Sequence, residues 1–131
     1  MSGARMNGAR MRGVLPGPVL AWCPFPSEAE ARTVAGVLLD EDLVACANII
    51  PGMVSLYKWQ GERGEGREVG VLFKTHAAVA SRMTARLARL HSYQSPAIML
   101  WDASATPQAT SDWLAGLAQG QASGFDGHEP G

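Results

Sequence analysis

The longest apolar stretch of the chain runs from Leu43 to Gly61 and is broken by Pro51-Gly52. This pattern predicts a long strand with a kink, because proline lacks a backbone donor and glycine tolerates the dihedral angles of a bulge. Such a strand fits the edge of a sheet better than its centre. Since an open apolar edge pairs with other chains, we expect a protein element or a second copy of the chain to cover it.

Three shorter stretches also have the pattern of strands. In them, short apolar runs or apolar residues at every second position occur at Val19–Cys23, Val69–Lys74 and Ala97–Trp101. Between the long strand and Val69 lies GERGEGRE (61–68), which carries three glycines and mixed charges. This composition predicts a solvated hairpin loop.

Apolar residues at helical spacing predict three helices. They are expected at residues 27–39, at about 77–91 and from Pro107 onward. Ser27 and Glu30 form a capping box at the start of the first helix. The second helix has an apolar face and an opposite face of three arginines, which is typical of a helix that lies on a core.

The order of these elements is β-α-β-β-α-β followed by an extra C-terminal helix. It predicts an α+β, ferredoxin-like sandwich, in which both main helices cover one face of an antiparallel sheet. In this arrangement the first strand lies between the third and fourth, and the long second strand is an edge. One helical layer cannot bury both apolar faces of that strand, so we expect the chain to form oligomers.

Composition and charge narrow the class of protein. The chain has 131 residues, of which 47% are hydrophobic and 18% charged, which favours one globular domain. We expect this domain at residues 14–119, between a flexible leader at 1–13 and a disordered tail at 120–131. The alternative for the leader is an over-extended reading frame with true initiation at Met11. Without the leader's three arginines, 8 basic residues remain against 12 acidic ones. A body with net charge near −4 predicts no binding to nucleic acid or membranes.

The remaining sequence signals concern location and catalysis. Pro16, Gly17 and Pro18 interrupt the first apolar run, and no run is long enough to span a bilayer, so we expect a cytoplasmic protein. The sequence has no HExxH motif, no phosphate-cradling glycine motif and no Ser/His/Asp pattern. We therefore expect a protein that is not an enzyme.

Thiol and imidazole groups are the side chains that copper and zinc prefer. The candidates are Cys23, Cys46, His76, His91 and His128. The predicted topology places Cys23 and His91 at the same end of the sheet and Cys46 at the other end. Two strand spacings, about 10 Å, separate the cysteines, which is too far for a disulfide. Cys46 with His76 forms a second, weaker candidate pair.

Four segments in register resemble one family. LVACANIIPGMVSLYKWQGE, EVGVLFKT, LHSYQSPAIM and SDWLAGL are together similar to the CutA1 divalent-cation-tolerance proteins, over roughly Val19 to Leu117. The resemblance implies a ferredoxin-like fold and a homotrimer with an architecture similar to the PII signalling proteins. It also implies a link to copper and other divalent cations such as zinc.

The resemblance further implies Cys23 and His91 as copper ligands. Some members of the family carry a cysteine and two consecutive histidines at these positions. Here Leu90 replaces the first histidine, and Gln60 and Gln94 replace carboxylates that many members have. Water, a backbone group or a neighbouring protomer would have to complete the ligand shell.

Each candidate residue also has a purely structural interpretation. Cys23 and Cys46 are typical of small buried apolar residues, and His91 of a residue that meets the last carbonyls of a helix. His76 is expected to form a local hydrogen bond. The function therefore stays open between a trimer that binds metal ions in a metal response, a PII-like sensor or adaptor, and a scaffold without a ligand. The PII-like alternative predicts clefts between subunits near Tyr57, Trp59 and Lys74, although the aromatic pair is also typical of packing anchors.

Overall fold

The structure, a computed structural model, describes residues 17–123. Its elements are β1 (Pro18–Phe25), α1 (Glu28–Asp40), β2 (Cys46–Trp59), β3 (Glu62–His76), α2 (Ala80–Leu90), β4 (Met99–Asp102) and α3 (Gln108–Ser123). The strands form one antiparallel sheet in the order β2-β3-β1-β4. This confirms the predicted α+β class, the central position of β1 and the edge position of β2.

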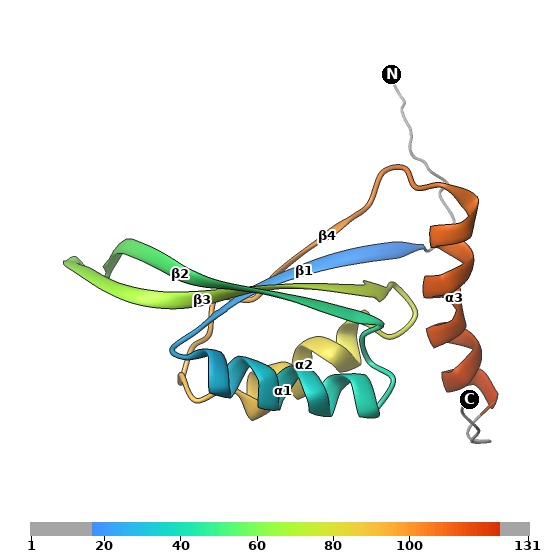
Figure 1. Cartoon of the computed structure of the whole chain (residues 1–131), viewed down its shortest axis with the longest axis horizontal. Helices are drawn as coiled ribbons and strands as arrows, with labels where there is room; N and C mark the ends of the chain where they lie inside the picture. The colour runs from blue at the N-terminus through green and yellow to red at the C-terminus, as the bar shows by residue number, and fades with distance from the viewer. Residues whose placement is uncertain (1–16, 124–131) are drawn as a thin grey trace.

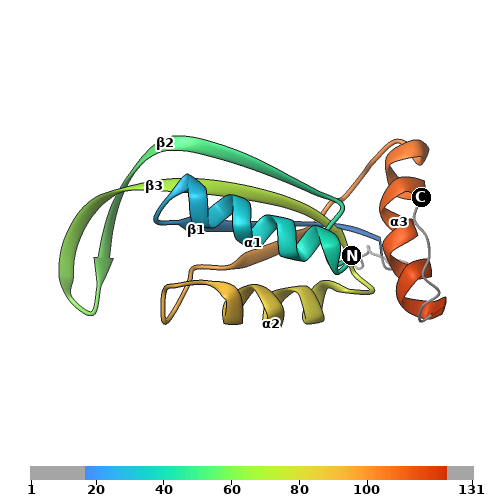
Figure 2. The same cartoon turned by 60° about the horizontal axis from the view of Figure 1, so that its bottom comes forward.

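Helices α1 and α2 cover one face of the sheet, and α3 lies across one end of it (Figures 1 and 2). On β1 every second residue is buried against this helical layer, ending with Cys23 and Phe25. The helices contribute small and branched side chains to the same core, namely Ala31, Val34, Ala35, Leu38, Met83 and Leu87. Among residues 17–123, none of the helices combines the length and hydropathy needed to cross a bilayer.

The predicted kink of β2 is confirmed. The pairing between β2 and β3 shifts register between Ile50 and Met53, so Pro51 and Gly52 form a bulge. Gly52 has a φ of 78°, a conformation that glycine adopts without steric cost. The bulge bends the long β2–β3 hairpin, whose outer part extends beyond the helical layer as a two-stranded ribbon (Figure 1).

The prediction of a loop at residues 61–68 is wrong. β3 begins at Glu62, which pairs with Trp59, so the turn contains only Gln60 and Gly61. Both have positive φ, 52° and 83°, which identifies a two-residue type I′ turn whose twist matches the strands. The charged residues of this segment therefore lie on a strand that pairs with β2 in a solvent-exposed ribbon. The exposure of the ribbon explains why the segment mixes glycine with charged residues.

Several element boundaries differ from the predictions. α2 begins at Ala80, because residues 77–79 form a turn in which the Val79 N–H donates to the His76 carbonyl over 3.0 Å. β4 begins at Met99 and not at Ala97. α3 continues to Ser123, past the expected domain end at residue 119. The predicted leader (1–13), the end of the tail and His128 lie outside the described residues.

Candidate functional site

Cys23 and His91 meet at one end of the sheet, as the topology predicts. Cys23 is fully buried on the helix-facing side of β1, two residues before the strand ends. His91 is the C-cap of α2, and its backbone N–H donates to the Leu87 carbonyl over 3.0 Å. The imidazole itself is buried, because the chain turns away from the helix in an extended conformation at this residue.

The two side chains share one acceptor, the carbonyl of Pro24. His91 Nε2 lies 2.7 Å from this oxygen, and the Cys23 thiol donates to it over 3.5 Å. His91 Nδ1 accepts a hydrogen bond from the Tyr93 N–H over 3.1 Å. Since a backbone N–H only donates, the neutral ring carries its proton on Nε2, which donates to Pro24. Both ring nitrogens are therefore engaged within the protomer.

Aromatic neighbours fix the plane of the His91 ring. It stacks on Phe25 with centroids 4.4 Å apart and an interplanar angle of 18°. Tyr93 lies on it at 4.8 Å with a tilt of 41°. Stacked rings of this spacing add packing energy to the hydrogen bonds. The imidazole therefore joins β1 to the end of α2 and the segment that follows.

Two carboxylates complete the polar surroundings. Glu30 Oε2 accepts from the Ser92 N–H over 2.9 Å and lies 3.7 Å from His91 Nδ1. Glu68 accepts a 2.7 Å hydrogen bond from the Tyr93 hydroxyl. Desolvation, then this hydrogen bond, raise the pKa of Tyr93. Desolvation by burial, with smaller contributions from Glu68 and Glu30, raises the pKa of Cys23 from 9.0 to about 12.

These donors do not fit a metal ion as the protomer is folded. Metals bind the thiolate, and the Cys23 thiol keeps its proton at neutral pH. Neither nitrogen of His91 has a lone pair free for a metal. Among residues 17–123, moreover, no three His, Cys, Asp or Glu side chains lie close enough together to hold one. Within one protomer, hydrogen bonds hold this cluster together.

The other predicted ligands lie elsewhere. Cys46, half-buried at the start of β2, directs its thiol to Asn48 Oδ1 at 3.6 Å. His76, at the end of β3, accepts from the Ala78 N–H over 3.0 Å, which confirms the expected local hydrogen bond. Cys46 pairs with Lys74 and Cys23 with Val71, so the two cysteines are separated across and along the sheet, as predicted.

The sequence does not predict that Glu30, Glu68 and Tyr93 belong to the polar surroundings of Cys23 and His91. The capping box drew attention to Glu30, and Ser27 Oγ does accept from the Glu30 N–H over 3.1 Å. The Glu30 carboxylate, however, accepts from Ser92, 62 residues away, and so it joins the start of α1 to the end of α2. A carboxylate in the first turn of a helix is so common that only the folded chain shows this second partner.

A separate surface of exposed apolar residues lies on the ribbon. Tyr57 and Trp59 lie on one of its faces, and the Tyr57 ring covers Gly64. Val54 and Leu56 lie on the opposite face, and Leu56 is 65% exposed. A thin ribbon with apolar side chains on both faces has no core of its own. Both faces of the ribbon therefore present apolar side chains that a partner could cover.

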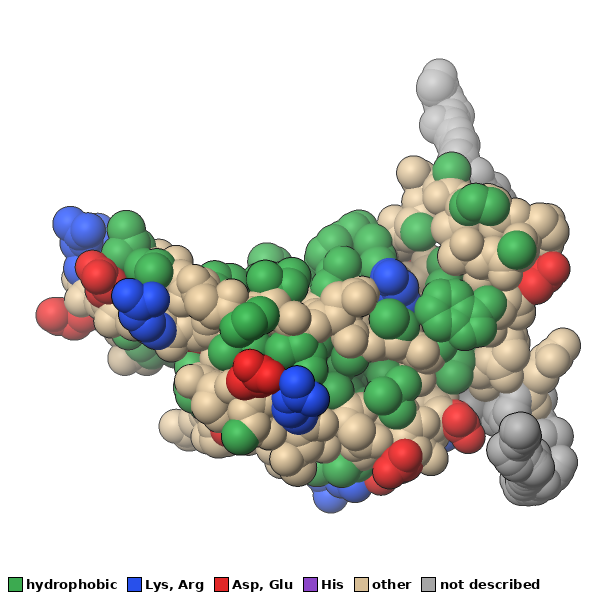
Figure 3. All heavy atoms as spheres, viewed as in Figure 1, with side chains coloured by type: hydrophobic (Ala, Val, Ile, Leu, Met, Phe, Trp, Pro, Cys, Tyr) green, Lys and Arg blue, Asp and Glu red, His purple; other side chains and the backbone are tan. Residues whose placement is uncertain are grey.

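The sheet face away from α1 and α2, here called the open face, is also apolar. Trp22 and Leu20 lie on it, opposite Met99 and Trp101 of β4. Met99 is 59% exposed, and Trp101 and Ile50 are about half exposed. Hydrophobic side chains gather along this side of the molecule between the ribbon and α3 (Figure 3). Contiguous apolar surface of this kind is typical of sites that bind another protein, a membrane or a ligand.

Comparison with known proteins gives one consistent result. The family described as CutA1 divalent ion tolerance protein matches residues 19–116. A relative from Thermus thermophilus named divalent-cation tolerance protein CutA is 40% identical over 89 residues, which cover 68% of this chain and 86% of the relative. These relatives are named for tolerance of divalent cations and not for a reaction.

Solved structures agree with the fold. CutA from Xylella fastidiosa superimposes with a TM-score of 0.74 at 30% identity, covering 77% of this chain and 97% of that one. CutA from Archaeoglobus fulgidus, described as a periplasmic divalent cation tolerance protein, gives a TM-score of 0.72 at 26% identity, covering 76% and 97%. The cytoplasmic location of the present chain therefore stays a prediction from its sequence.

Proposed function

The chain belongs to the CutA1 divalent ion tolerance family, and from this premise we propose that it acts as a homotrimer in the cellular response to divalent metal ions. The observation that carries the proposal is the exposed apolar surface of the ribbon and the open face. The proposed role is binding and assembly without catalysis, in the cytoplasm.

The exposed apolar surfaces favour a ring over a dimer. A two-fold dimer pairs one patch with the same patch on its partner. Here the ribbon exposes two different faces, one with Leu56 and one with Trp59, and the open face is a third surface. Contacts between unlike patches close into rings, and in a ring of three each ribbon would lie between neighbours. The PII-like clefts expected near Tyr57 would lie at the same boundaries.

A matched pair of substitutions tests the assembly. Leu56→Asp places a charge on the ribbon, whereas Leu39→Asp places the same charge on an exposed residue of α1 in the helical layer. We expect light scattering to show a trimer for the wild type and for Leu39→Asp, and smaller species for Leu56→Asp. A Leu56→Asp variant that keeps the wild-type mass would contradict the proposed interface.

Metal binding at Cys23 and His91 is the second part of the proposal, and it requires the hydrogen bonds of both side chains to rearrange. Copper or zinc would have to displace the hydrogen bonds to Pro24 and Tyr93 and remove the proton of Cys23. Two protein donors leave the rest of the shell to water or to a neighbouring protomer. We therefore expect weak binding near neutral pH that strengthens as the pH rises.

Titration calorimetry with zinc, and with Cu(I) in the absence of air, tests this part. Cys23→Ala should abolish the pH-dependent binding, and Cys46→Ala serves as the matched control because it removes the other thiol. Equal stoichiometry and affinity for the wild type and Cys23→Ala would remove the proposed site. This outcome would leave the trimer proposal untouched, because the two measurements are independent.

A further inference from the structure

One face of α2 concentrates positive charge. Arg82, Arg86 and Arg89 are four and three residues apart, so they lie on the same side of the helix, and none of the residues of α2 is acidic. Residues 17–123 contain 8 basic and 10 acidic residues, so the described part of the chain is acidic overall. Three of the eight thus gather on a single 11-residue helix of an acidic protein.

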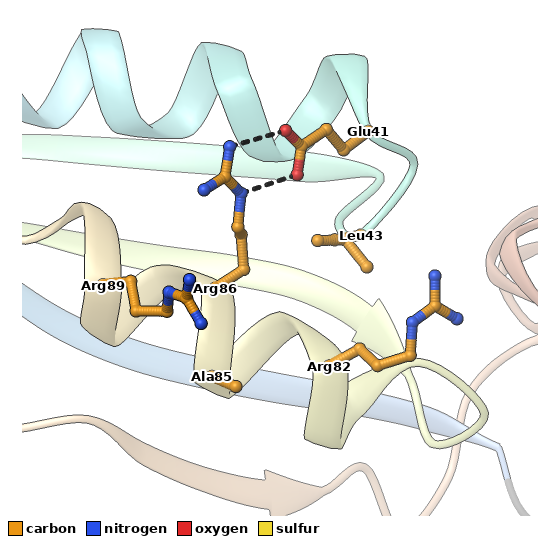
Figure 4. Close-up of a pocket in the computed structure, with 6 residues that line it drawn as sticks. All are labelled: Glu41, Leu43, Arg82, Ala85, Arg86 and Arg89. Atoms are coloured by element: carbon orange, nitrogen blue, oxygen red, sulfur yellow. Dashed lines mark hydrogen bonds and ion pairs between the residues drawn. The ribbon is translucent and has the colours of Figure 1, made fainter.

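These arginines line a hollow between α2 and the end of α1. It has a volume of about 380 Å³, and its remaining lining consists of Glu41, Leu43 and Ala85. Figure 4 shows Arg86 extending from α2 to Glu41, with Leu43 on the same side of the hollow as Glu41, and Arg82 and Arg89 extending from α2 on either side of Arg86. The hollow is shallow and open to solvent, so a ligand there would contact α2 and the end of α1 on one side only.

Only one arginine of the hollow is paired with a carboxylate of the described chain. Arg86 donates two hydrogen bonds to Glu41, from Nε and from a terminal nitrogen, each of 2.8 Å. Arg82 and Arg89 make no hydrogen bond or ion pair with any side chain of residues 17–123. Asp40 and Asp42 flank Glu41 in the chain but do not line the hollow. The lining therefore carries three positive charges and one negative charge.

We propose that this hollow binds a small polyanion that carries two or more phosphoryl groups. A guanidinium group presents its donors in a planar fork that matches phosphate oxygens, and it stays charged at every physiological pH. The rise of a helix separates Arg82 from Arg89 by about 10 Å, a distance that two long side chains span when they converge on one anion. A compact di- or triphosphate supplies several charges over this length.

The helical layer keeps the hollow available in the proposed trimer. The apolar residues that would mediate assembly lie on the ribbon and on the open face, which is turned away from α1 and α2 (Figure 2). Leu43 is buried and adds an apolar side chain to the lining of the hollow. The site depends neither on the oligomeric state nor on metal binding.

Isothermal titration of the full chain with tripolyphosphate tests the proposal, at about 0.01 M ionic strength, where the Debye length is about 30 Å. We expect Arg82→Gln and Arg89→Gln each to weaken binding about tenfold, as expected for the loss of one charge-assisted contact. Glu41→Gln should strengthen binding, because it frees Arg86 from its competing carboxylate. The matched control is Arg32→Gln, since Arg32 lies on α1 and pairs with Glu28 away from the hollow.

The outcomes distinguish specific binding of tripolyphosphate in the hollow from non-specific attraction between the anion and exposed arginines. Arginine variants that bind as tightly as the wild type, or an Arg32→Gln variant that weakens binding as much as they do, would overturn the proposal. Citrate, a tricarboxylate titrated in parallel, is expected to bind at least tenfold more weakly. If citrate binds equally well, the assignment to phosphoryl groups is wrong. All four positions are exposed or half-buried, so the variants are expected to fold.

Discussion

Replacing His91 by phenylalanine tests whether hydrogen bonds hold the Cys23–His91 cluster together. The substitution keeps a ring between Phe25 and Tyr93 but removes both nitrogens. The Pro24 carbonyl then loses its 2.7 Å donor, and the Tyr93 N–H loses its acceptor. Each buried polar group left without a partner costs about 1–3 kcal/mol. Because both groups are only part-buried and Cys23 still donates to Pro24, we expect His91→Phe to lower the free energy of unfolding by about 1–3 kcal/mol.

Urea denaturation at a fixed protein concentration, with a chelator present, measures this loss. His76→Phe is the matched control, because it is also buried but breaks one local hydrogen bond, to Ala78, and should cost only about 1 kcal/mol. Unchanged stability of His91→Phe would refute the reasoning. So would a wild type that loses several kcal/mol on chelation alone, because a bound metal would then be what holds His91.

The remaining predictions concern the core, the open face and the thiols. Thr75→Val should lower the free energy of unfolding in urea by about 1–2 kcal/mol, because the buried hydroxyl donates to the Leu43 carbonyl over 2.7 Å; unchanged stability would contradict this role. Gly70→Ala should cost about 1–3 kcal/mol and weaken the oligomer, since its new methyl group meets the Trp22 ring, whereas Gly66→Ala, which has open space, should leave the oligomer intact. Raising the pH from about 9 to 12 should lower the free energy of unfolding of the wild type more than that of the Cys23→Ala variant. The reason is that the pKa of the Cys23 thiol is near 9.0 in the unfolded chain and about 12 in the folded chain, so that ionisation favours unfolding in this range. An equal loss of stability in urea for both proteins would refute this. In the native protein, mass spectrometry should find Cys46 alkylated before Cys23.

The strand order was predictable because the element sequence β-α-β-β-α-β permits few arrangements. The kink at Pro51-Gly52 was predictable because two residues with special backbone chemistry adjoin there. The length of the hairpin was not. A charged, glycine-rich segment has the composition of a loop, and its pairing follows from the turn at Gln60, a residue that gives little sign of a positive φ.

The position of the candidate site was predictable from the sequence, but the hydrogen bonding of its side chains was not. Topology brings Cys23 and His91 to one end of the sheet from their positions in the sequence alone. Their engagement with Pro24 and Tyr93 depends on which atoms lie within hydrogen-bond distance after packing, and that in turn sets the tautomer of His91. Glu30 reaches Ser92 across 62 residues, a contact that no local pattern encodes.

Native mass spectrometry of the full chain, metal-free and copper-loaded, tests the central claim most directly. We expect the metal-free protein already to have three times the 13.9 kDa mass of one chain, because apolar surface and not metal drives assembly. Copper should add mass without changing the number of subunits. A metal-free monomer, or a trimer that forms only with copper, would show that apolar surface alone does not assemble the protein.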